Sequence, residues 1–121
     1  MAIRGLRGAT TVKTNAQEDI LKGTKELLGV LFENNDITVE DIASIFFSVT
    51  KDLDAVFPAK AAREMGLVHT PMLCLNEINV SDSVNFCIRI LLHVNSEKKQ
   101  SDFKPIYLND AIKLRPEFAS K

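Results

Sequence analysis

The chain has 121 residues and carries 15 basic and 16 acidic side chains, so its formal net charge at pH 7 is -1. Because the two signs nearly cancel and no basic block stands alone, we expect neither a nucleic acid nor an anionic membrane as a partner. A chain of this length forms one domain, residues 1–121, and buries about two thirds of the surface that it exposes when unfolded.

Two features of the sequence point to the cytoplasm. No stretch reaches the roughly 18 apolar residues needed to span a bilayer, and the N-terminal segment lacks the apolar region of a secretion signal. Cys74 and Cys87 show no CxxC spacing, and strand alternation makes both of them partly buried thiols rather than a disulfide. The sequence therefore predicts a soluble protein of the reducing cytoplasm.

A first strand is predicted over residues 2–12, where side chains alternate between two faces. Gly5 and Gly8 bracket Arg7 in this strand. Glycine in a strand leaves room for a ligand or another backbone to come close. Arg7 therefore either stands in a cleft or is an exposed arginine near a terminus.

A long amphipathic helix follows, in which apolar residues recur at helical spacing from Ile20 to Phe32. Asn15 and Glu18 have the spacing of a capping box at its start, and residues 34–36 end it. Its internal glycines weaken it, so we expect it to depend on packing against a sheet.

A short turn, a second strand and a short helix are expected next. Thr38 caps the turn together with Asp41, and the β-favouring run 45–50 predicts the strand. Pro58 suits the first position of the short helix, and Gly66 suits its C-terminal end.

Lys60 and Arg63 lie three residues apart, which places both cations on one face of this short helix, directly after Phe57. The common explanation for such a pair is a solvated helix face. The alternative is a site for an anion.

Three further strands are predicted over residues 72–78, 87–94 and 105–108, and Tyr107 lies in the last of them. Asn109 is expected to cap the following turn, and residues 117–121 are expected to form a flexible tail.

The order of these elements defines an α+β fold with a mixed five-stranded sheet, one long helix and several short ones. One long helix covers only one face of such a sheet. The uncovered face, or the sheet edges, should therefore be buried by other copies of the chain, which predicts a homo-oligomer.

Glu77 and Arg89 are charges in strands that are otherwise apolar. A guanidinium does not lose its proton, so a buried Arg89 must find an anion in the protein or in a ligand. Either Glu77 and Arg89 form an ion pair across neighbouring strands, or one of them reaches the sheet edge, or the arginine serves a ligand.

The sequence shows no metal-ligand spacing around its histidines and no phosphate-binding glycine loop, so we expect no metal and no nucleotide cofactor. Nothing marks Cys74 or Cys87 as an activated nucleophile. Arginine forks bind carboxylates and can stabilise developing negative charge without any nucleophile. The remaining set of cations suits a small polyanion: Arg7, Lys60, Arg63, Arg89 and Arg115.

Five runs of the sequence are informative when taken together: IRGLRGATTV, DLDAVFPAKAARE, CLNE, CIRILLHV and IYLNDAIKLRPE. In their order and nearly in their spacing they resemble the monofunctional, trimeric class of chorismate mutase, and the resemblance covers roughly residues 2–118. It implies a pseudo-α/β-barrel homotrimer with active sites between subunits. It also implies the isomerisation of chorismate to prephenate in aromatic amino-acid biosynthesis, with no metal or cofactor.

The implied reaction is a pericyclic, Claisen-type rearrangement, which fits a chain without a visible nucleophile. Catalysis would hold the dicarboxylate substrate in a compact geometry and stabilise charge on the breaking ether oxygen. By position, Arg89 is similar to the arginine that donates to that oxygen, and Glu77 to the glutamate that holds the ring hydroxyl. Arg7 and Tyr107 match groups that bind the side-chain carboxylate.

The resemblance implies further substrate contacts along the chain. Cys74 would lie beside the hydroxyl, next to Leu73, which replaces a threonine often found there. The segment expected from the neighbouring subunit contains Phe57, Ala59, Lys60 and Arg63, and the C-terminal stretch expected to close over the site contains Leu114 and Arg115.

Two other functions stay open. One is a non-catalytic trimeric module that binds a small carboxylate metabolite, because a fold does not fix a function. The other is an assembly protein whose charges form interface salt bridges. The joint presence of Arg7, Glu77, Arg89 and Tyr107 favours the enzyme, since a carboxylate sensor has no evident need for Glu77.

Overall fold

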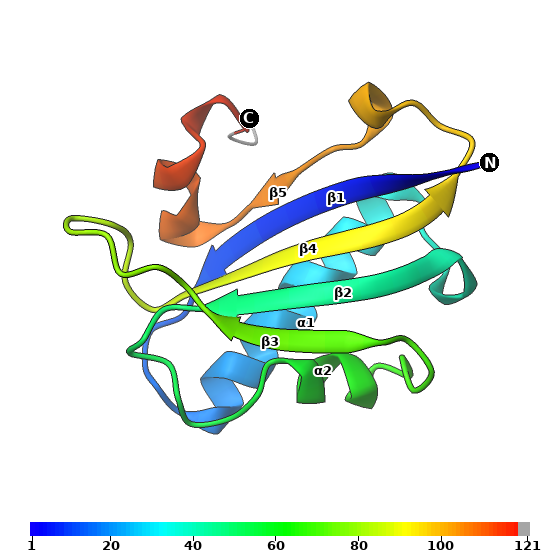
Figure 1. The fold of residues 1–121 in the computed structure, drawn as a ribbon. Coiled ribbons are helices and arrows are strands. Elements are labelled where there is room, and N and C mark those ends of the chain that lie inside the picture. Colours follow the sequence, from blue (N-terminus) through cyan, green and yellow to red (C-terminus); the bar gives the residue numbers. More distant parts are fainter. Residues whose placement is uncertain (119–121) are drawn as a thin grey trace.

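The computed structural model describes residues 1–118 and contains a five-stranded sheet with its α-helices packed behind it (Figure 1). The strands are β1 (Ala2–Thr11), β2 (Ile42–Val49), β3 (Met72–Asn76), β4 (Cys87–Ser96) and β5 (Ile106–Tyr107). The α-helices are α1 (Gln17–Asn35) and α2 (Ala59–Glu64). Short 3-10 helices cover Val39–Asp41, Gln100–Asp102, Asn109–Leu114 and Pro116–Phe118.

The strand order in the sheet is β3-β2-β4-β1-β5. β4 runs antiparallel to both β1 and β2, whereas β3 pairs with β2 and β5 pairs with β1 in parallel. The predicted α+β class with a mixed five-stranded sheet is therefore confirmed. β2 begins at Ile42, earlier than the predicted run 45–50, and β4 extends as far as Ser96.

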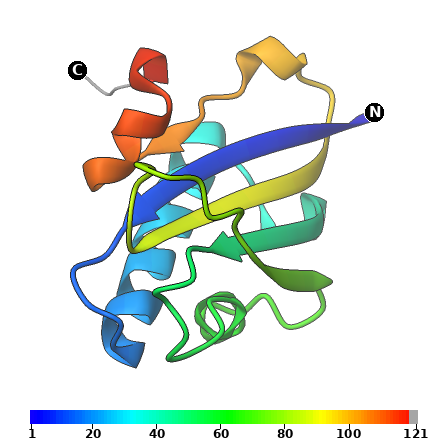
Figure 2. The ribbon, with the colours of Figure 1, turned by 60° about the vertical axis from the view of Figure 1, so that its left-hand side comes forward.

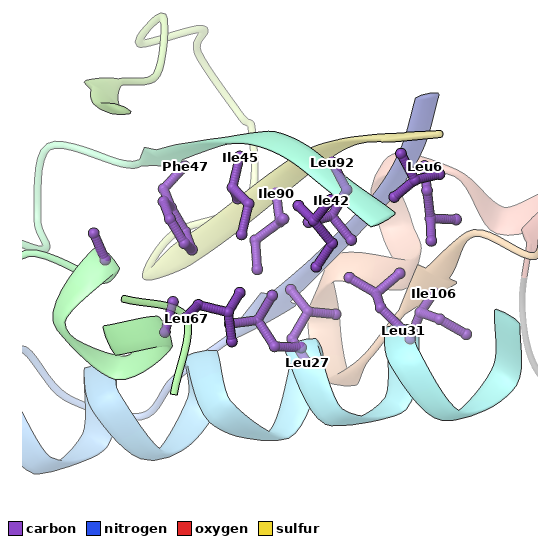
Figure 3. Packing of buried hydrophobic residues seen from close by; sticks show 14 of the residues in the cluster. Leu6, Leu27, Leu31, Ile42, Ile45, Phe47, Leu67, Ile90, Leu92 and Ile106 are labelled. Atoms are coloured by element: carbon purple, nitrogen blue, oxygen red, sulfur yellow. The ribbon is translucent and has the colours of Figure 1, made fainter. Parts of the chain in front are cut away.

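The main core lies between the sheet and α1 (Figure 3). Alternation along β4 directs Ile90 and Leu92 to this side, where they pack with Leu27 and Leu31 of α1. Burying each of these side chains contributes about 1.5–3 kcal/mol. This tertiary packing stabilises a helix whose internal glycines would otherwise weaken it.

Gly8 allows β1 to lie against both β5 and α1. A Cβ atom at this position would lie 2.8 Å from the carbonyl oxygen of Ile106 and 3.1 Å from Cδ1 of Leu27. Both distances are shorter than normal van der Waals contacts, so a side chain here would push the elements apart.

The ends of α2 lie within one residue of the predicted ones, but the predicted cap of α1 is wrong. Pro58 directly precedes α2, and Gly66 follows it with a φ of 101°, in the left-handed region that favours glycine. Asn15 lies outside α1 and pairs instead with another loop: its Nδ2 donates to Asp54 Oδ1 at 2.7 Å, and its Oδ1 accepts from the Asp54 backbone N–H at 2.9 Å. A long-range contact between loops has replaced the local cap.

Of two other predicted caps, Thr38 is confirmed at the N-cap position, whereas Asn109 as a cap is wrong. Thr38 precedes the first 3-10 helix as predicted, but its hydroxyl bonds to the carboxylate of Asp41 rather than to a backbone N–H. Asn109 lies inside its 3-10 helix with a φ of 54°, and its amide donates to Thr10 and Thr11 of β1. These hydrogen bonds connect the C-terminal segment to the sheet.

The C-terminal 3-10 helices pack over the β1 and β5 end of the sheet (Figure 1). Phe118 and Leu114 pack there with Ala9 and Tyr107. The flexibility expected for residues 117–121 stays a prediction, and residues 119–121 lie outside the described residues.

The two α-helices lie on one face of the sheet, and much of the opposite face is uncovered (Figure 2). Large apolar side chains are exposed on this uncovered face, at Ile3, Phe46, Leu73, Leu75 and Leu91. Burial of this face by other copies of the chain stays a prediction. Among residues 1–118, no helix has the length and apolar character needed to cross a membrane.

Candidate active site

Arg89 and Glu77 approach each other on the uncovered face of the sheet. Arg89 lies in β4, and Glu77 directly follows β3. Nη1 of Arg89 is 3.9 Å from Oε1 of Glu77, and the two side chains are 39% and 30% exposed. A direct charge-assisted hydrogen bond is shorter, about 2.7–2.9 Å. The Arg89 guanidinium is therefore oriented by Glu77 but keeps donors that a ligand can use.

Ser48 of β2 lies between these two charges. The sequence suggested an ion pair across neighbouring strands, but β2 separates β3 from β4. Ser48 is directly opposite Arg89 in the β2–β4 register, and its hydroxyl donates to Oε2 of Glu77 at 2.6 Å. The Glu77 backbone N–H donates to the Val49 carbonyl at 2.8 Å, which fixes the base of the side chain.

Arg7 and Tyr107 lie on the strands next to Arg89. Ala9 of β1 pairs with Arg89 on β4 and with Tyr107 on β5. Arg7 points to the same face of β1 as Ala9, so Arg7, Arg89 and Tyr107 surround this small residue. Cβ atoms of such paired or diagonal neighbours lie about 5–8 Å apart. That spacing suits the carboxylates of one small molecule.

Phe118 covers Arg7 and Tyr107. The Cζ atom of Arg7 lies 5.1 Å from the centroid of the Phe118 ring, and the Cζ atom of Arg115 lies 4.4 Å from it. The same ring stacks on Tyr107 with 5.7 Å between centroids. Arg115 also donates to Glu117 at 2.8 Å. A hydrogen bond from the Glu117 backbone and, after it, this bond from Arg115 lower the pKa of the Glu117 carboxyl.

A second group of predicted site residues lies at the opposite, β3 edge of the sheet. Phe57 precedes α2 and is 70% exposed. Phe57 and Cys74 line a cavity of about 490 Å³, whose wall also includes Pro58, Leu75 and Asn76. This cavity is mainly apolar in its lining residues, so it suits the carbon skeleton of a ligand more than its charges.

The remaining residues of the second group take different orientations. Ala59 is buried at the start of α2, whereas Lys60 and Arg63 are exposed on that helix. Leu73 is exposed on the uncovered face. Because neighbouring side chains on a strand point to opposite faces, Cys74 points toward the α-helical side.

The structure does not bring the two groups together within one chain. β3 and β5 are the outermost strands of the sheet (Figure 1). At the usual strand spacing they lie about 19 Å apart. Arg7 and Tyr107 therefore do not share a small-molecule site with Phe57 and Arg63 of the same chain.

Neither thiol has the character of a nucleophile. Both cysteines are free. Burial raises the pKa of Cys87 to about 11, and burial also raises the pKa of Cys74. Both side chains are therefore neutral thiols at pH 7. Within the described part of the chain, no three His, Cys, Asp or Glu side chains form a group that could hold a metal ion.

Sequence reasoning missed Ser48 and Phe118. In the structure Ser44, Phe46 and Ser48 share one face of β2, and small hydroxyl residues in an apolar strand are a weak signal of a polar contact. The strand order that sets Ser48 opposite Arg89 is not contained in that pattern. Phe118 was assigned to the tail because it follows Pro116.

The fold and the arrangement of these side chains suit the class of proteins that bind a small anionic molecule. Arg7, Arg89, Glu77 and Tyr107 stand together on the uncovered sheet face. Side chains of this kind can bind a small anion and stabilise negative charge that develops on it.

Comparison with known proteins identifies the family. Residues 3–118 match the sequence model of chorismate mutase type I. Chorismate mutase AroH of Bacillus subtilis (strain 168) is 41% identical over 120 residues, covering 98% of this chain and 94% of that protein. Chorismate mutase AroH of Thermus thermophilus is 40% identical over 119 residues, covering 98% of each chain. The chain therefore belongs to the chorismate mutase type I family.

A solved structure agrees with this assignment. The chorismate mutase from Clostridium thermocellum superposes with a TM-score of 0.87 at 50% sequence identity, covering 88% of this chain and 96% of that one. The family predicted from the sequence is thus confirmed. None of these comparisons supports the alternative of a non-catalytic binding module.

Proposed function

We propose that the chain isomerises chorismate to prephenate at a site centred on Arg89 and Glu77. The observation that carries this proposal is the Arg89 guanidinium. It stands half exposed on the uncovered sheet face and is 3.9 Å from its carboxylate neighbour. A chorismate mutase needs such a donor where charge develops on the ether oxygen of the substrate.

The rearrangement breaks the carbon–oxygen bond of the ether while a carbon–carbon bond forms, and no proton is transferred. Arg89 donates to the ether oxygen as negative charge builds up there. Glu77 accepts a hydrogen bond from the ring hydroxyl and lies beside the developing positive charge of the ring. The neutral state of Cys74 and Cys87 fits this mechanism, because it uses no thiolate.

Arg7 and Tyr107 bind the side-chain carboxylate of the substrate. Their support is the register, which places both around Ala9 and beside Arg89. Held on adjacent strands, these groups fold the flexible side chain over the ring, and this restriction removes part of the entropic barrier. Leu114 and Arg115 close the C-terminal side of the site, where Arg115 already lies against Phe118.

A second copy of the chain supplies Phe57, Ala59, Lys60, Arg63 and the Leu73–Cys74 edge. The separation of the outer strands, about 19 Å, is too large for one chain to surround one substrate. The exposed apolar residues of the uncovered face provide the surface for association. We assign a homotrimer with one site at each interface, in which Lys60 and Arg63 attract the dianionic substrate.

Two free thiols fit a reducing compartment, so the proposed location of the enzyme is the cytoplasm. The proposed pathway is the biosynthesis of aromatic amino acids, because prephenate is a precursor there.

The test of the reaction is the loss of chorismate absorbance after purified protein is added. Prephenate is identified by its acid conversion to phenylpyruvate. Turnover with formation of prephenate is expected. A folded protein that binds chorismate but leaves it unchanged would contradict the proposal and favour the non-catalytic module.

The test of the assembly is the molar mass in solution, measured by light scattering. The mass of three chains is expected. Leu75→Asp places a charge on the uncovered face and should reduce both the mass and the turnover. Val39→Asp is the matched control, because Val39 is an exposed apolar residue in the first 3-10 helix, outside the uncovered face. A monomeric parent with full activity would contradict the shared site.

A further inference from the structure

We propose that Ser48 is a positioning residue, which holds Glu77 in place and keeps Glu77 from closing on Arg89. The inference rests on the proposed function, because its meaning depends on Arg89 acting on the substrate. It concerns a residue that lies under the site and contacts no part of the substrate in this mechanism.

The first support is the path of the Glu77 side chain. Glu77 begins at the end of β3 and reaches Arg89 of β4 by passing over β2, which lies between these strands. Ser48 is the β2 residue directly opposite Arg89. A small side chain here leaves the path open, whereas a large one would fill it.

The second support is the hydrogen bond that Ser48 makes. Its hydroxyl donates to Oε2 of Glu77 at 2.6 Å, while the other carboxylate oxygen, Oε1, lies 3.9 Å from Arg89. One oxygen is thus held on β2, and the other is presented toward Arg89 and the space above the sheet. Half-buried Ser48 and the Glu77–Val49 backbone bond fix this geometry from below.

The third support is what an untethered pair of these charges would do. A carboxylate and a guanidinium that move freely form two parallel hydrogen bonds, each about 2.7–2.9 Å long. Such a pair would occupy the Arg89 donors that the ether oxygen needs. It would also turn the Glu77 carboxylate away from the ring hydroxyl. The Ser48 hydroxyl prevents this collapse by competing for one carboxylate oxygen.

Four variants test the role. Ser48→Ala removes the hydroxyl, Ser48→Thr keeps it and adds a methyl group, and Ser48→Val adds similar bulk without a hydroxyl. Ser44→Ala is the matched control. Ser44 lies on the same face of β2, and its hydroxyl contacts Nδ1 of His93 at 3.1 Å rather than a residue of the site.

We expect Ser48→Ala and Ser48→Val to lower kcat by about ten-fold or more, because a hydrogen bond to a charged group is lost. KM should change by less than about three-fold, since Arg7 and Tyr107 still bind the substrate. Ser48→Thr should stay within about three-fold of the parent kcat, and Ser44→Ala should match the parent. Circular dichroism and light scattering would verify that each variant is folded and assembled.

A second measurement separates positioning from a general structural effect. In a chain that already carries Glu77→Ala, adding Ser48→Ala should change the residual rate by less than about two-fold, because Ser48 acts through Glu77. A ten-fold loss in that background would overturn the proposal. Parental kcat in Ser48→Ala, or failure of Ser48→Thr to exceed Ser48→Val, would also overturn it. The parent's own turnover, measured alongside, tests the proposed function separately.

Discussion

Replacing two glycines by alanine should have opposite effects on stability, although the chemical change is the same. Gly8→Ala places a Cβ atom 2.8 Å from the backbone oxygen of Ile106, inside normal contact distance. Gly29 lies within α1, and a Cβ atom there would meet nothing within 4 Å. The first change introduces a clash with backbone, and the second introduces only a better helix former.

The expected magnitudes follow from these contacts. Gly8→Ala must displace β5 by several tenths of an ångström and also presses on Leu27 and Leu31 of α1, at 3.1 and 3.3 Å. Overpacking of this kind costs about 1–3 kcal/mol in the free energy of unfolding. Gly29→Ala should add about 0.8–1 kcal/mol, the helix-propensity difference between the two residues.

Thermal unfolding of the parent and both variants at one protein concentration measures these effects, because the unfolding temperature of an oligomer depends on concentration. Gly8→Ala should also raise KM, since β5 carries Tyr107. A Gly8→Ala protein as stable as the parent would refute the close packing of β1 against β5. A Gly29→Ala protein with reduced stability would refute the open environment on α1.

Two further predictions concern Phe118 and Cys87. Phe118→Ala removes the ring from Arg7 and should raise KM for chorismate by about two- to five-fold, which is the value of one exposed cation–π contact. Phe118→Tyr keeps an aromatic ring and should leave KM unchanged. An unchanged KM in Phe118→Ala would show that the ring does not order Arg7. Burial raises the pKa of Cys87 from 9.0 to about 11. Between these two pH values the unfolded chain therefore binds fewer protons than the folded chain, and the free energy of unfolding should fall as the pH rises through this range. Urea unfolding at pH 8 and pH 10.5 should show a smaller pH-dependent loss for Cys87→Ala than for the parent, and equal losses would contradict a buried thiol.

Local signals located the main helices and strands, and alternation assigned the two faces of the strands over residues 2–12 and 87–94. The run 87–94 alternates so regularly that its core face, with Ile90 and Leu92, could be assigned before the structure was known. The same alternation placed Arg89 on the opposite face, where it is found. The approximate positions of the helices and strands follow from the same local signals.

Strand order and long-range contacts could not be predicted in this way. β2 separates β3 from β4, so the Glu77–Arg89 approach depends on a third strand that the local pattern does not place. Asn15 had the spacing of a helix cap, but a loop distant in sequence offered it better hydrogen-bond partners at Asp54. In both cases tertiary contacts overrode or completed what local sequence indicated.

The candidate site was likewise predictable only in part from the sequence. The resemblance to the family carried the predicted site residues to their positions, and it implied that the segment from Phe57 to Arg63 comes from a neighbouring subunit. Arg7 and Phe57 lie toward opposite edges of the sheet because β1 and β3 do. Strand order gives the proposed role of a second copy its independent structural support.

The most direct test of the central claim is the kcat of Arg89→Ala, measured beside the parent and Arg89→Lys in the chorismate assay. Arg89 is half exposed, so truncation should leave the protein folded and assembled. We expect Arg89→Ala to lose about 3 kcal/mol or more of transition-state stabilisation, the usual effect of removing a preorganised donor. Lysine should recover little, because a point charge does not reproduce the guanidinium fork. Near-parental turnover by a folded, assembled Arg89→Ala protein would contradict the claim that Arg89 stabilises the breaking ether bond.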